Sequence, residues 1–235
     1  MALAYPSFRT AEPLSPYLPE NLRRGLVLYL WMNEGAGDRV YDLSGNGNHG
    51  TIYGATWTRL ASGKNALYFD GVDDYVDCGN APSLNTFSSI TITVLAKQMR
   101  WTGGLDAWVL DKDYTGYRIW GLDRHRAMFR SPTQDWQTVD GGSVPELNRW
   151  YHLTAVYDGD ALMLRLYRDG VLVAQSASSE KLNFGFSGVP LRLGRHSVDS
   201  KFYPVVIGYV AIYNRALSDA EIRTLYNLHR GLFVG

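Results

Sequence analysis

The sequence has little that could crosslink the chain or attract it to a charged partner. Cys78 is the only cysteine among 235 residues, so neither an intramolecular disulfide nor a cysteine-based zinc site can form. Lys and Arg number 23, and so do Asp and Glu, which gives a formal net charge of zero. Without an excess of positive charge, we expect no nucleic-acid partner.

Long apolar runs are lacking as well. No apolar stretch approaches the ~20 residues that span a membrane, so we expect no membrane insertion. The N-terminus carries Arg9, Glu12 and Glu20 where a signal peptide would be apolar, so none is expected here. Hydrophobic residues nevertheless make up 46% of the chain, which is sufficient for a folded domain with one buried core.

Residues typical of helix surfaces are scarce, whereas residues typical of turns are common. Asp outnumbers Glu 17 to 6, and the 24 glycines cluster with Asn and Asp in short segments. Many short strands between such turns are typical of an all-β sandwich, which we therefore expect. The predicted strands are Leu26–Trp31, Ala66–Phe69, Ile90–Ala96, Trp108–Leu110, Tyr117–Trp120, Ala127–Arg130, Trp150–Tyr157, Leu162–Tyr167, Val171–Ala174, Leu191–Leu193 and Val205–Tyr213.

Two local signals predict a hairpin and a helix. Asp169 and Gly170 separate two strand-like runs, and they suit a tight turn whose two central residues have positive φ. Ser218 and Glu221 have the spacing of a capping box, in which both side chains satisfy free backbone N–H groups. Apolar residues follow at helical spacing: Ile222, Leu225 and Leu228. A short C-terminal helix is therefore expected.

Residues 1–24 differ from the rest of the chain. They hold four of the nine prolines and show neither the period of a strand nor that of a helix. We therefore expect an extended, proline-rich N-terminal arm, followed by one domain over residues 25–235. A strand or coil that folds back on the domain is an equally good interpretation of the same residues.

Five segments that follow one another in order carry a resemblance to a known family. They are Gly25–Gly50, which contains DLSGNGNHG, Ala66–Val76 (ALYFDGVDDYV), Trp150–Gly159 (WYHLTAVYDG), Leu166–Gly170 (LYRDG) and Ile212–Ser218 (IYNRALS). Over residues 24–230 the chain resembles laminin-G-like domains of the concanavalin A-like lectin and glucanase group. The resemblance implies a jelly roll of two curved antiparallel sheets packed face to face. It leaves function open, because this fold hosts lectins, adhesion modules, glycosidases and virion proteins.

Catalytic residues are not evident. Retaining glycosidases of the resembling fold place two Glu a few residues apart, since the two carboxyl groups must lie ~5–5.5 Å apart. The six Glu of this chain are at least eight positions apart, so we expect no enzyme. In an atypical glycosidase site, the acids to suspect would be Glu146, Asp111 and Asp113. The five histidines are dispersed, and His152, within a strand, is expected to face solvent or a cross-strand partner.

A structural calcium ion is implied by the resemblance. Related domains often hold the ion with an Asp-Gly segment and with an Asp-Glu pair that precedes the late Ile-Tyr-Asn-Arg strand. Gly208-Tyr209 occupies the place of that pair, so one expected carboxylate is missing. The candidate ligands, which offer the hard oxygens that calcium prefers, are Asp70, Gly71, Asp73 and Asp74. Alternatively, these Asp side chains accept hydrogen bonds from N–H groups of the turn.

Side chains suited to sugars are densest between residues 101 and 136. Sugar sites combine flat rings, which lie against C–H faces, with polar groups that bind hydroxyls. The candidate ligand contacts are Trp101, Trp108, Asp111, Asp113, Tyr114, Tyr117, Trp120 and Trp136. Aromatic residues at alternate positions can equally belong to the core or pair across strands.

Together, these observations favour a non-catalytic binding or structural module on the surface of a larger assembly. Such domains act outside the cell, and a virion protein reaches the exterior without a signal peptide. The leading hypothesis is therefore a phage capsid decoration or tail component with affinity for cell-surface glycans. Other virion subunits would be held through the N-terminal arm, and a homo-oligomer is left open. The alternatives are a free-standing lectin or adhesion module and a glycoside hydrolase with an atypical site.

Overall fold

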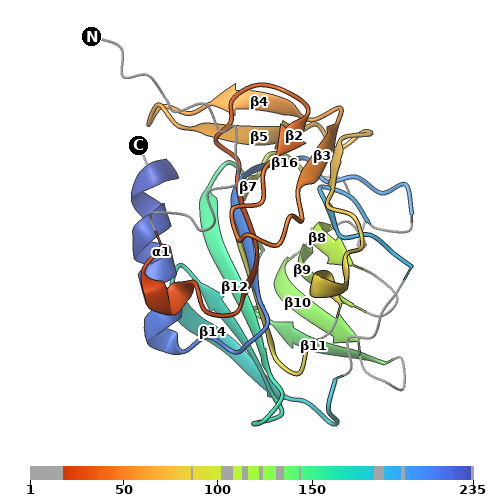
Figure 1. The fold of residues 1–235 in the computed structure, drawn as a ribbon, viewed down its shortest axis with the longest axis vertical. Helices are drawn as coiled ribbons and strands as arrows, with labels where there is room; N and C mark the ends of the chain where they lie inside the picture. Colours follow the sequence, from red (N-terminus) through yellow and green to blue (C-terminus); the bar gives the residue numbers. More distant parts are fainter. Residues whose placement is uncertain are drawn as a thin grey trace.

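Two antiparallel sheets packed face to face form the domain, and one helix covers part of the first sheet (Figure 1). The computed structural model describes residues 18–85, 87–101, 108–112, 116–121, 124–130, 135–142, 144–182, 188–196 and 199–233. The predicted all-β sandwich with a short C-terminal helix is confirmed. No helix among these residues is long and apolar enough to cross a membrane.

The first sheet has eight strands. Its order is β14 (Val171–Ala177), β13 (Met163–Arg168), β12 (Trp150–Asp158), β7 (Ile90–Gln98), β16 (Val205–Tyr213), β5 (Asn65–Phe69) and β4 (Thr56–Arg59), and β1 (Leu26–Trp31) also pairs with β16. The helix α1 (Asp219–Phe233) follows β16 directly.

The second sheet also has eight strands. Its order is β11 (Trp136–Asp140), β10 (Arg124–Arg130), β9 (Tyr117–Gly121), β8 (Trp108–Lys112), β15 (Arg192–Leu193), β6 (Tyr75–Asp77), β3 (Gly50–Tyr53) and β2 (Arg39–Val40). Two short 3-10 helices, η1 (Glu20–Leu22) and η2 (Pro82–Leu84), lie outside the sheets.

All eleven predicted strands are present, and five short strands were missed. The missed strands are β2, β3, β4, β6 and β11. Each has only two to five residues, of which at most one is buried, so their sequences lack the apolar alternation that reveals a strand. In β7, by contrast, Ile90, Ile92 and Val94 belong to the core between the sheets, while Thr91 and Thr93 face the other side.

The hairpin and the helix cap confirm the local predictions. Asp169 and Gly170 have φ values of 53° and 77°, as a turn of this type requires. Ser218 N donates to Glu221 Oε2 at 2.9 Å, and Glu221 N donates to Ser218 Oγ at 3.3 Å. Arg215 binds both oxygens of the same carboxylate at 2.7 and 3.0 Å, and these bonds lower the pKa of Glu221 to about 2.

The N-terminal boundary of the domain lies earlier than predicted. Leu18 and Leu22 are 2% and 0% exposed, and they share a buried cluster with Ile222 and Leu225 of α1. Residues 18–22 therefore follow the alternative interpretation, in which this segment folds back on the domain. Residues 1–17 lie outside the described residues, so the arm stays a prediction there.

The face of α1 that packs on the first sheet also differs from the predicted one. Leu228 is 38% exposed, whereas the neighbouring His229 is 2% exposed. The His229 ring stacks on Tyr209 with 3.8 Å between ring centroids, and its Nε2 lies 2.8 Å from the Tyr29 hydroxyl. A polar side chain therefore completes the buried face of the helix, because sheet residues supply hydrogen-bond partners for it.

His152 does not face solvent. It is 1% exposed, and its Nε2 lies 2.5 Å from the Tyr209 hydroxyl and 3.2 Å from Thr93 Oγ1. The predicted alternative of a cross-strand partner is therefore the correct one, since Thr93 belongs to β7, which pairs with β12. Tyr209 comes from β16, one strand farther in the sheet. Burial lowers the pKa of His152 to about 3, so the ring is neutral at pH 7.

Candidate functional site

The outer face of the second sheet, opposite the core, carries arginine and tryptophan side chains. On β9, Tyr117 and Ile119 belong to the core, so Arg118 between them faces outward. On β10, the core residues Ala127 and Phe129 alternate in the same way with outward-facing side chains. The aromatic and basic residues on this part of the outer face are Trp108, Arg118, Arg126, Arg130 and Trp136; we call them the Arg–Trp ladder.

The ladder is held by close contacts between guanidinium groups and indole rings. Arg118 Cζ lies 4.1 Å from the ring centroid of Trp136 and 5.1 Å from that of Trp108. Arg126 Cζ lies 5.1 Å from the Trp108 ring, and Arg130 Cζ lies 5.0 Å from the Trp136 ring. Trp108 and Arg118 are almost fully buried, whereas Arg126, Arg130 and Trp136 are partly exposed. The exposed members can therefore meet a ligand while the buried members fix their position.

Asp111 anchors the buried part of the ladder. Its side chain is 0% exposed, Oδ1 lies 3.8 Å from Arg118 Nε, and Oδ2 lies 3.6 Å from His196 Nε2. His196 Nδ1 accepts a hydrogen bond from the Asp199 N–H at 3.1 Å, so the ring proton lies on Nε2 and points toward the carboxylate. The Asp111 carboxylate thus balances the positive charge of its basic neighbours and is not available as a catalytic acid.

A second aromatic cluster lies farther along the same sheet. Tyr53 and Tyr75 stack with 4.5 Å between centroids and 10° between planes, and Tyr53 is 47% exposed. Arg195 Cζ lies 4.9 Å from the Tyr75 ring. Arg192, whose Nε lies 3.2 Å from Asp77 Oδ2, approaches the same ring. Rings and arginines therefore recur from β11 to β3.

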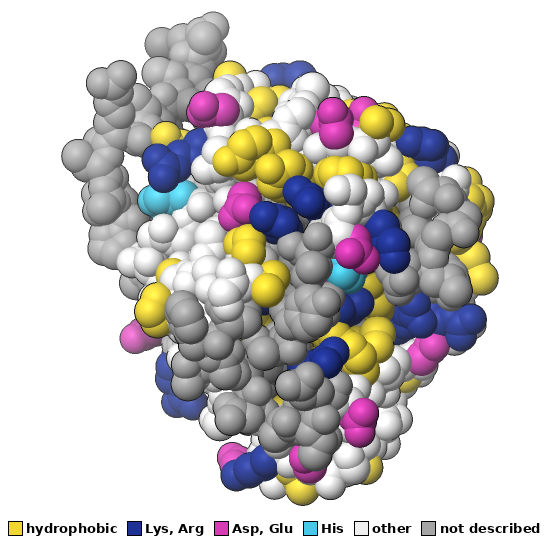
Figure 2. Space-filling model, turned by 90° about the vertical axis from the view of Figure 1, so that its right-hand side faces the viewer, with side chains coloured by type: hydrophobic (Ala, Val, Ile, Leu, Met, Phe, Trp, Pro, Cys, Tyr) yellow, Lys and Arg dark blue, Asp and Glu magenta, His cyan; other side chains and the backbone are white. Residues whose placement is uncertain are grey.

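Figure 2 shows the side of the molecule on which the second sheet lies. Dark blue Lys and Arg side chains recur across this face, with hydrophobic and acidic side chains between them. Mixed rings and guanidinium groups are suited to ligands with both C–H faces and hydroxyl or acidic groups.

The structure places the predicted ligand contacts in different environments. Trp108, Asp111 and Trp136 meet on the outer face of the second sheet. Tyr117 and Trp120 are 0% exposed and belong to the core, so the prediction that they contact a ligand is corrected. Trp108 and Asp111 are also buried, at 1% and 0% exposure, so neither reaches the surface itself. Trp136 is partly exposed and Trp101, just after β7, is 45% exposed, so for these two the contact stays a prediction. Asp113 and Tyr114 lie outside the described residues.

Local backbone geometry explains the error at Trp120. Its φ is 65°, and the register of β9 against β10 shifts between Arg124 and Ala127. Simple alternation would turn Trp120 outward next to the core residue Ile119, but the irregular backbone turns both side chains inward. Sequence alternation alone does not reveal such a shift.

Several residues of this face were missed by the sequence-based prediction. Arg126 and Arg130 were not singled out, although β10 reads Arg-His-Arg-Ala-Met-Phe-Arg with arginines at even spacing. That spacing was the available signal, since residues two or four apart on a strand share a face. Tyr53 and Tyr75 carry no local signal, because they meet only through the pairing of β3 with β6.

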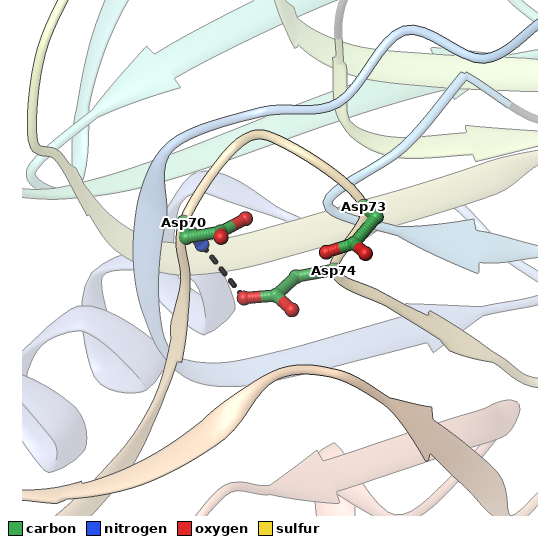
Figure 3. Close-up of side chains that lie close together, drawn as sticks. All are labelled: Asp70, Asp73 and Asp74. Atoms are coloured by element: carbon green, nitrogen blue, oxygen red, sulfur yellow. Dashed lines mark hydrogen bonds between the residues drawn. The ribbon is translucent and has the colours of Figure 1, made fainter.

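The predicted calcium ligands lie together in the turn between β5 and β6. One carboxylate oxygen each from Asp70, Asp73 and Asp74 lies within 4.8 Å of the other two, and Figure 3 shows the side chains converging. Asp70 N donates to Asp74 Oδ2 at 2.8 Å, and Val72 N donates to Asp70 Oδ1 at 2.7 Å. Burial raises the pKa of Asp74. The donor set suits calcium, while two carboxylates already bind backbone N–H groups of the turn as the alternative prediction required.

The acids suspected of catalysis do not assemble into a pair. Asp111 is engaged by Arg118 and His196, as described above. Glu146 lies in the loop before β12, where Arg149 Nη1 binds its carboxylate at 2.7 Å. Asp113 lies outside the described residues. Among the described residues, the partners given above for Asp111 and Glu146 are thus basic groups, with no second carboxyl group placed beside either as a catalytic partner.

A family model matches most of the domain. Residues 69–223 match the model of the concanavalin A-like lectin/glucanases superfamily. No curated protein matches the sequence.

Solved structures with a similar fold include those of two toxins and a sialidase. The binding domain of Paraclostridial Mosquitocidal Protein 1 has a TM-score of 0.70 and 17% identity, over 88% of this chain and 52% of that one. For botulinum neurotoxin type C the TM-score is 0.67 and the identity 16%, with coverages of 88% and 52%. Trypanosoma rangeli sialidase gives 0.65 and 17%, over 90% of this chain and 34% of that one. The chain thus spans about half the length of the toxin domains, and at these identities the likeness shows the fold alone.

Proposed function

We propose that this chain, which belongs to the concanavalin A-like lectin/glucanases superfamily, is a non-catalytic module that binds carbohydrate on the outer face of its second sheet. The observation that carries the proposal is the Arg–Trp ladder. Trp136 is partly exposed and lies between Arg118 and Arg130, with ring-to-guanidinium distances of 4.1 and 5.0 Å. A ring held in this way offers its exposed surface to the C–H face of a sugar, while neighbouring guanidinium groups donate to hydroxyl or carboxylate oxygens.

The structural neighbours give support of a general kind. The structure of botulinum neurotoxin type C concerns cell entry that depends on two ganglioside molecules. That of the sialidase contains a difluorinated nonulosonic acid ligand. This chain covers only 34% of the sialidase chain and 52% of the neurotoxin chain. The sugar in those structures can therefore lie in a part that has no counterpart here. A role in glycan binding nevertheless agrees with the sugar ligands named for these two structures.

The absence of catalysis is part of the proposal. Glycoside hydrolysis needs two carboxyl groups around the scissile bond, one of them free to act as an acid. Asp111 is buried between two basic partners, and Glu146 pairs with Arg149 in a different loop. We therefore expect the module to retain glycans without cleaving them.

A role on a phage virion stays a prediction. It depends on residues 1–17, which lie outside the described residues. If such a role exists, the domain would supply glycan affinity and the N-terminal residues would supply attachment to the assembly. A structure of the parent assembly would test this directly.

A glycan array tests the proposed function. The labelled protein should be retained by a subset of glycans, and incubation with those glycans should release no new reducing ends. Retention by none of the glycans on an array that includes neutral and acidic classes would contradict carbohydrate binding. Release of reducing ends would contradict the non-catalytic part of the proposal.

A further inference from the structure

A pocket lies on the first-sheet side of the molecule, beside the C-terminal half of α1. Its cavity volume is about 480 Å³, and it is lined by residues of the β4–β5 turn, the end of β7, the loop before β12 and the β13–β14 turn, as well as by α1. Ligand pockets typically have volumes of about 300–1,000 Å³. We call this cavity the helix-end pocket.

The charged side chains that line the helix-end pocket are mostly basic. They are Lys97, Arg149, Arg230 and Asp169. Asp169 accepts a hydrogen bond from the His152 N–H at 3.0 Å and lies 3.9 Å from Arg149 Nη2, so its charge is already engaged. Lys97 and Arg230 form no ion pair with any residue that the structure describes. Two cations therefore remain to attract an anion into the pocket.

Aromatic rings accompany both of these cations. Lys97 Nζ lies 5.4 Å from the centroid of Trp150, its register partner across β7 and β12. Arg230 Cζ lies 5.6 Å from the ring of Tyr226, one turn earlier on α1. Both rings are partly exposed, and both line the pocket.

The walls of the pocket are fixed by packing beneath them. The Tyr226 ring meets the His152 ring edge to face at 5.7 Å, and it also lies against Gly170, where a Cβ would come within 3.1 Å of it. The Asn148 N–H donates to Gln98 O at 2.8 Å, which ties the loop before β12 to β7. A pocket built on such contacts needs little rearrangement to bind a ligand.

We propose that the helix-end pocket binds a sugar that carries a carboxylate or a sulfate. The anionic group pairs with Lys97 and Arg230, the ring packs against Trp150, and the side chain of Asn148, which also lines the pocket, binds a hydroxyl. The aromatic rings suit the C–H face of a sugar, and the two cations suit an anionic group. A ligand that has both features uses both parts of the pocket. The inference rests on the proposed carbohydrate binding but adds a second site, on the other sheet.

Calorimetric titration with three sugars tests this inference. Methyl glucuronide and glucose 6-sulfate are the acidic probes, and methyl glucoside is the matched neutral probe. Both acidic sugars should bind at least about tenfold more tightly than methyl glucoside. Equal affinity for methyl glucoside would overturn the proposal. Inorganic sulfate that binds as tightly as glucose 6-sulfate would overturn its sugar part.

Variants locate the binding. Lys97→Met keeps the aliphatic contact with Trp150 and removes the charge, so methyl glucuronide should bind about tenfold more weakly. Arg230→Ala should have a similar effect, whereas Arg165→Ala, which removes a basic residue elsewhere on the first sheet, should have none. Trp136→Ala separates the two proposals: if it abolishes methyl glucuronide binding and Lys97→Met does not, the pocket is refuted and the second sheet is supported. Melting temperatures confirm that each variant is folded.

Discussion

The outer faces of the two sheets differ in what covers them and in how their polar groups are paired. On the first sheet, α1 and residues 18–22 enclose a cluster in which Tyr29, His229 and Tyr209 are 0–2% exposed. On the second sheet, the outer face carries arginines that lie against tryptophan rings and pair with aspartates. The cluster beneath the helix therefore holds neutral hydrogen-bonded groups, whereas the second-sheet face holds charge.

This difference shows that the outward-facing side chains of an alternating strand can be either buried under a helix or left at the surface. Burial lowers the pKa of His152 to about 3 and that of His229 to about 4, so both rings remain neutral beneath the helix. Neutral groups that hydrogen-bond to one another can be closed off from water at small cost. The arginines of the second-sheet face, by contrast, lie beside tryptophan rings, and Arg126 and Arg130 are partly exposed. The helix-end pocket lies beside this closed cluster, and Tyr226 and Arg230 of α1 line it.

The largest expected effect comes from breaking the closed face. Leu22→Ala removes a side chain that is 0% exposed and should lower the free energy of unfolding by about 2–5 kcal/mol. For a chain of this length, that corresponds to a fall in melting temperature of about 5–15 °C. Leu228→Ala, at a side chain that is 38% exposed, is the matched control and should cost less than about 1 kcal/mol. Similar losses in both variants would contradict the early domain boundary.

The next effect is a dependence of stability on pH. His229 has a pKa of about 4 in the folded state and about 6.5 when unfolded, so the unfolded chain binds more protons between these values. The free energy of unfolding is therefore undiminished by this group above about pH 6.5, and it decreases as the pH falls from 6.5 toward 4. Between pH 7 and pH 5, this histidine should cost about 2 kcal/mol.

Glu34 acts in the opposite direction, so a variant is needed to isolate the histidine. Burial raises the pKa of Glu34 to about 7, and the stability from its protonated form is therefore lost as the pH rises through 7. His229→Gln keeps a polar side chain near Tyr29 but cannot take up a proton in this range. Denaturant titrations at pH 7 and pH 5 should show a smaller acid loss for this variant than for the unaltered protein. Equal losses in the two proteins would refute the role of His229.

A further effect is expected from calcium at the turn between β5 and β6, which joins the two sheets. If the Asp70, Asp73 and Asp74 carboxylates hold the ion, saturating calcium should stabilise the fold by up to about 3 kcal/mol at a hundredfold excess over Kd. EDTA should then lower the melting temperature by less than about 10 °C. Asp73→Asn should remove the response, whereas Asp160→Asn, in another turn, should keep it. A melting temperature that is the same with calcium and with EDTA would contradict the site.

The sequence allowed the fold to be predicted where a pattern is local. The capping box of Ser218 and Glu221 and the turn at Asp169-Gly170 depend on neighbouring residues, and both are as predicted. The burial of Leu18 and Leu22 could not be predicted, because it depends on contacts with α1, about 200 residues later in the chain.

The candidate site was predictable only in part, for the same reason. The density of aromatic residues pointed to Trp108 and Trp136, but their arginine partners come from β9 and β10 and depend on strand register. Trp120 was misplaced because its positive φ reverses the direction of the side chain. Composition thus indicated the region, whereas pairing between strands decides which side chains meet.

The most direct test of the account compares the same substitution on the two sheets. Trp136→Ala removes the partly exposed ring of the ladder, and Trp57→Ala removes a partly exposed ring from β4 of the first sheet. Calorimetry should measure the affinity for the glycan that retains the most protein on the array. Melting temperatures check that each variant is folded. We expect Trp136→Ala to weaken binding at least about tenfold and Trp57→Ala to change it less than about twofold. Unchanged binding in Trp136→Ala, or an equal loss in both variants, would contradict the assignment of binding to the second sheet.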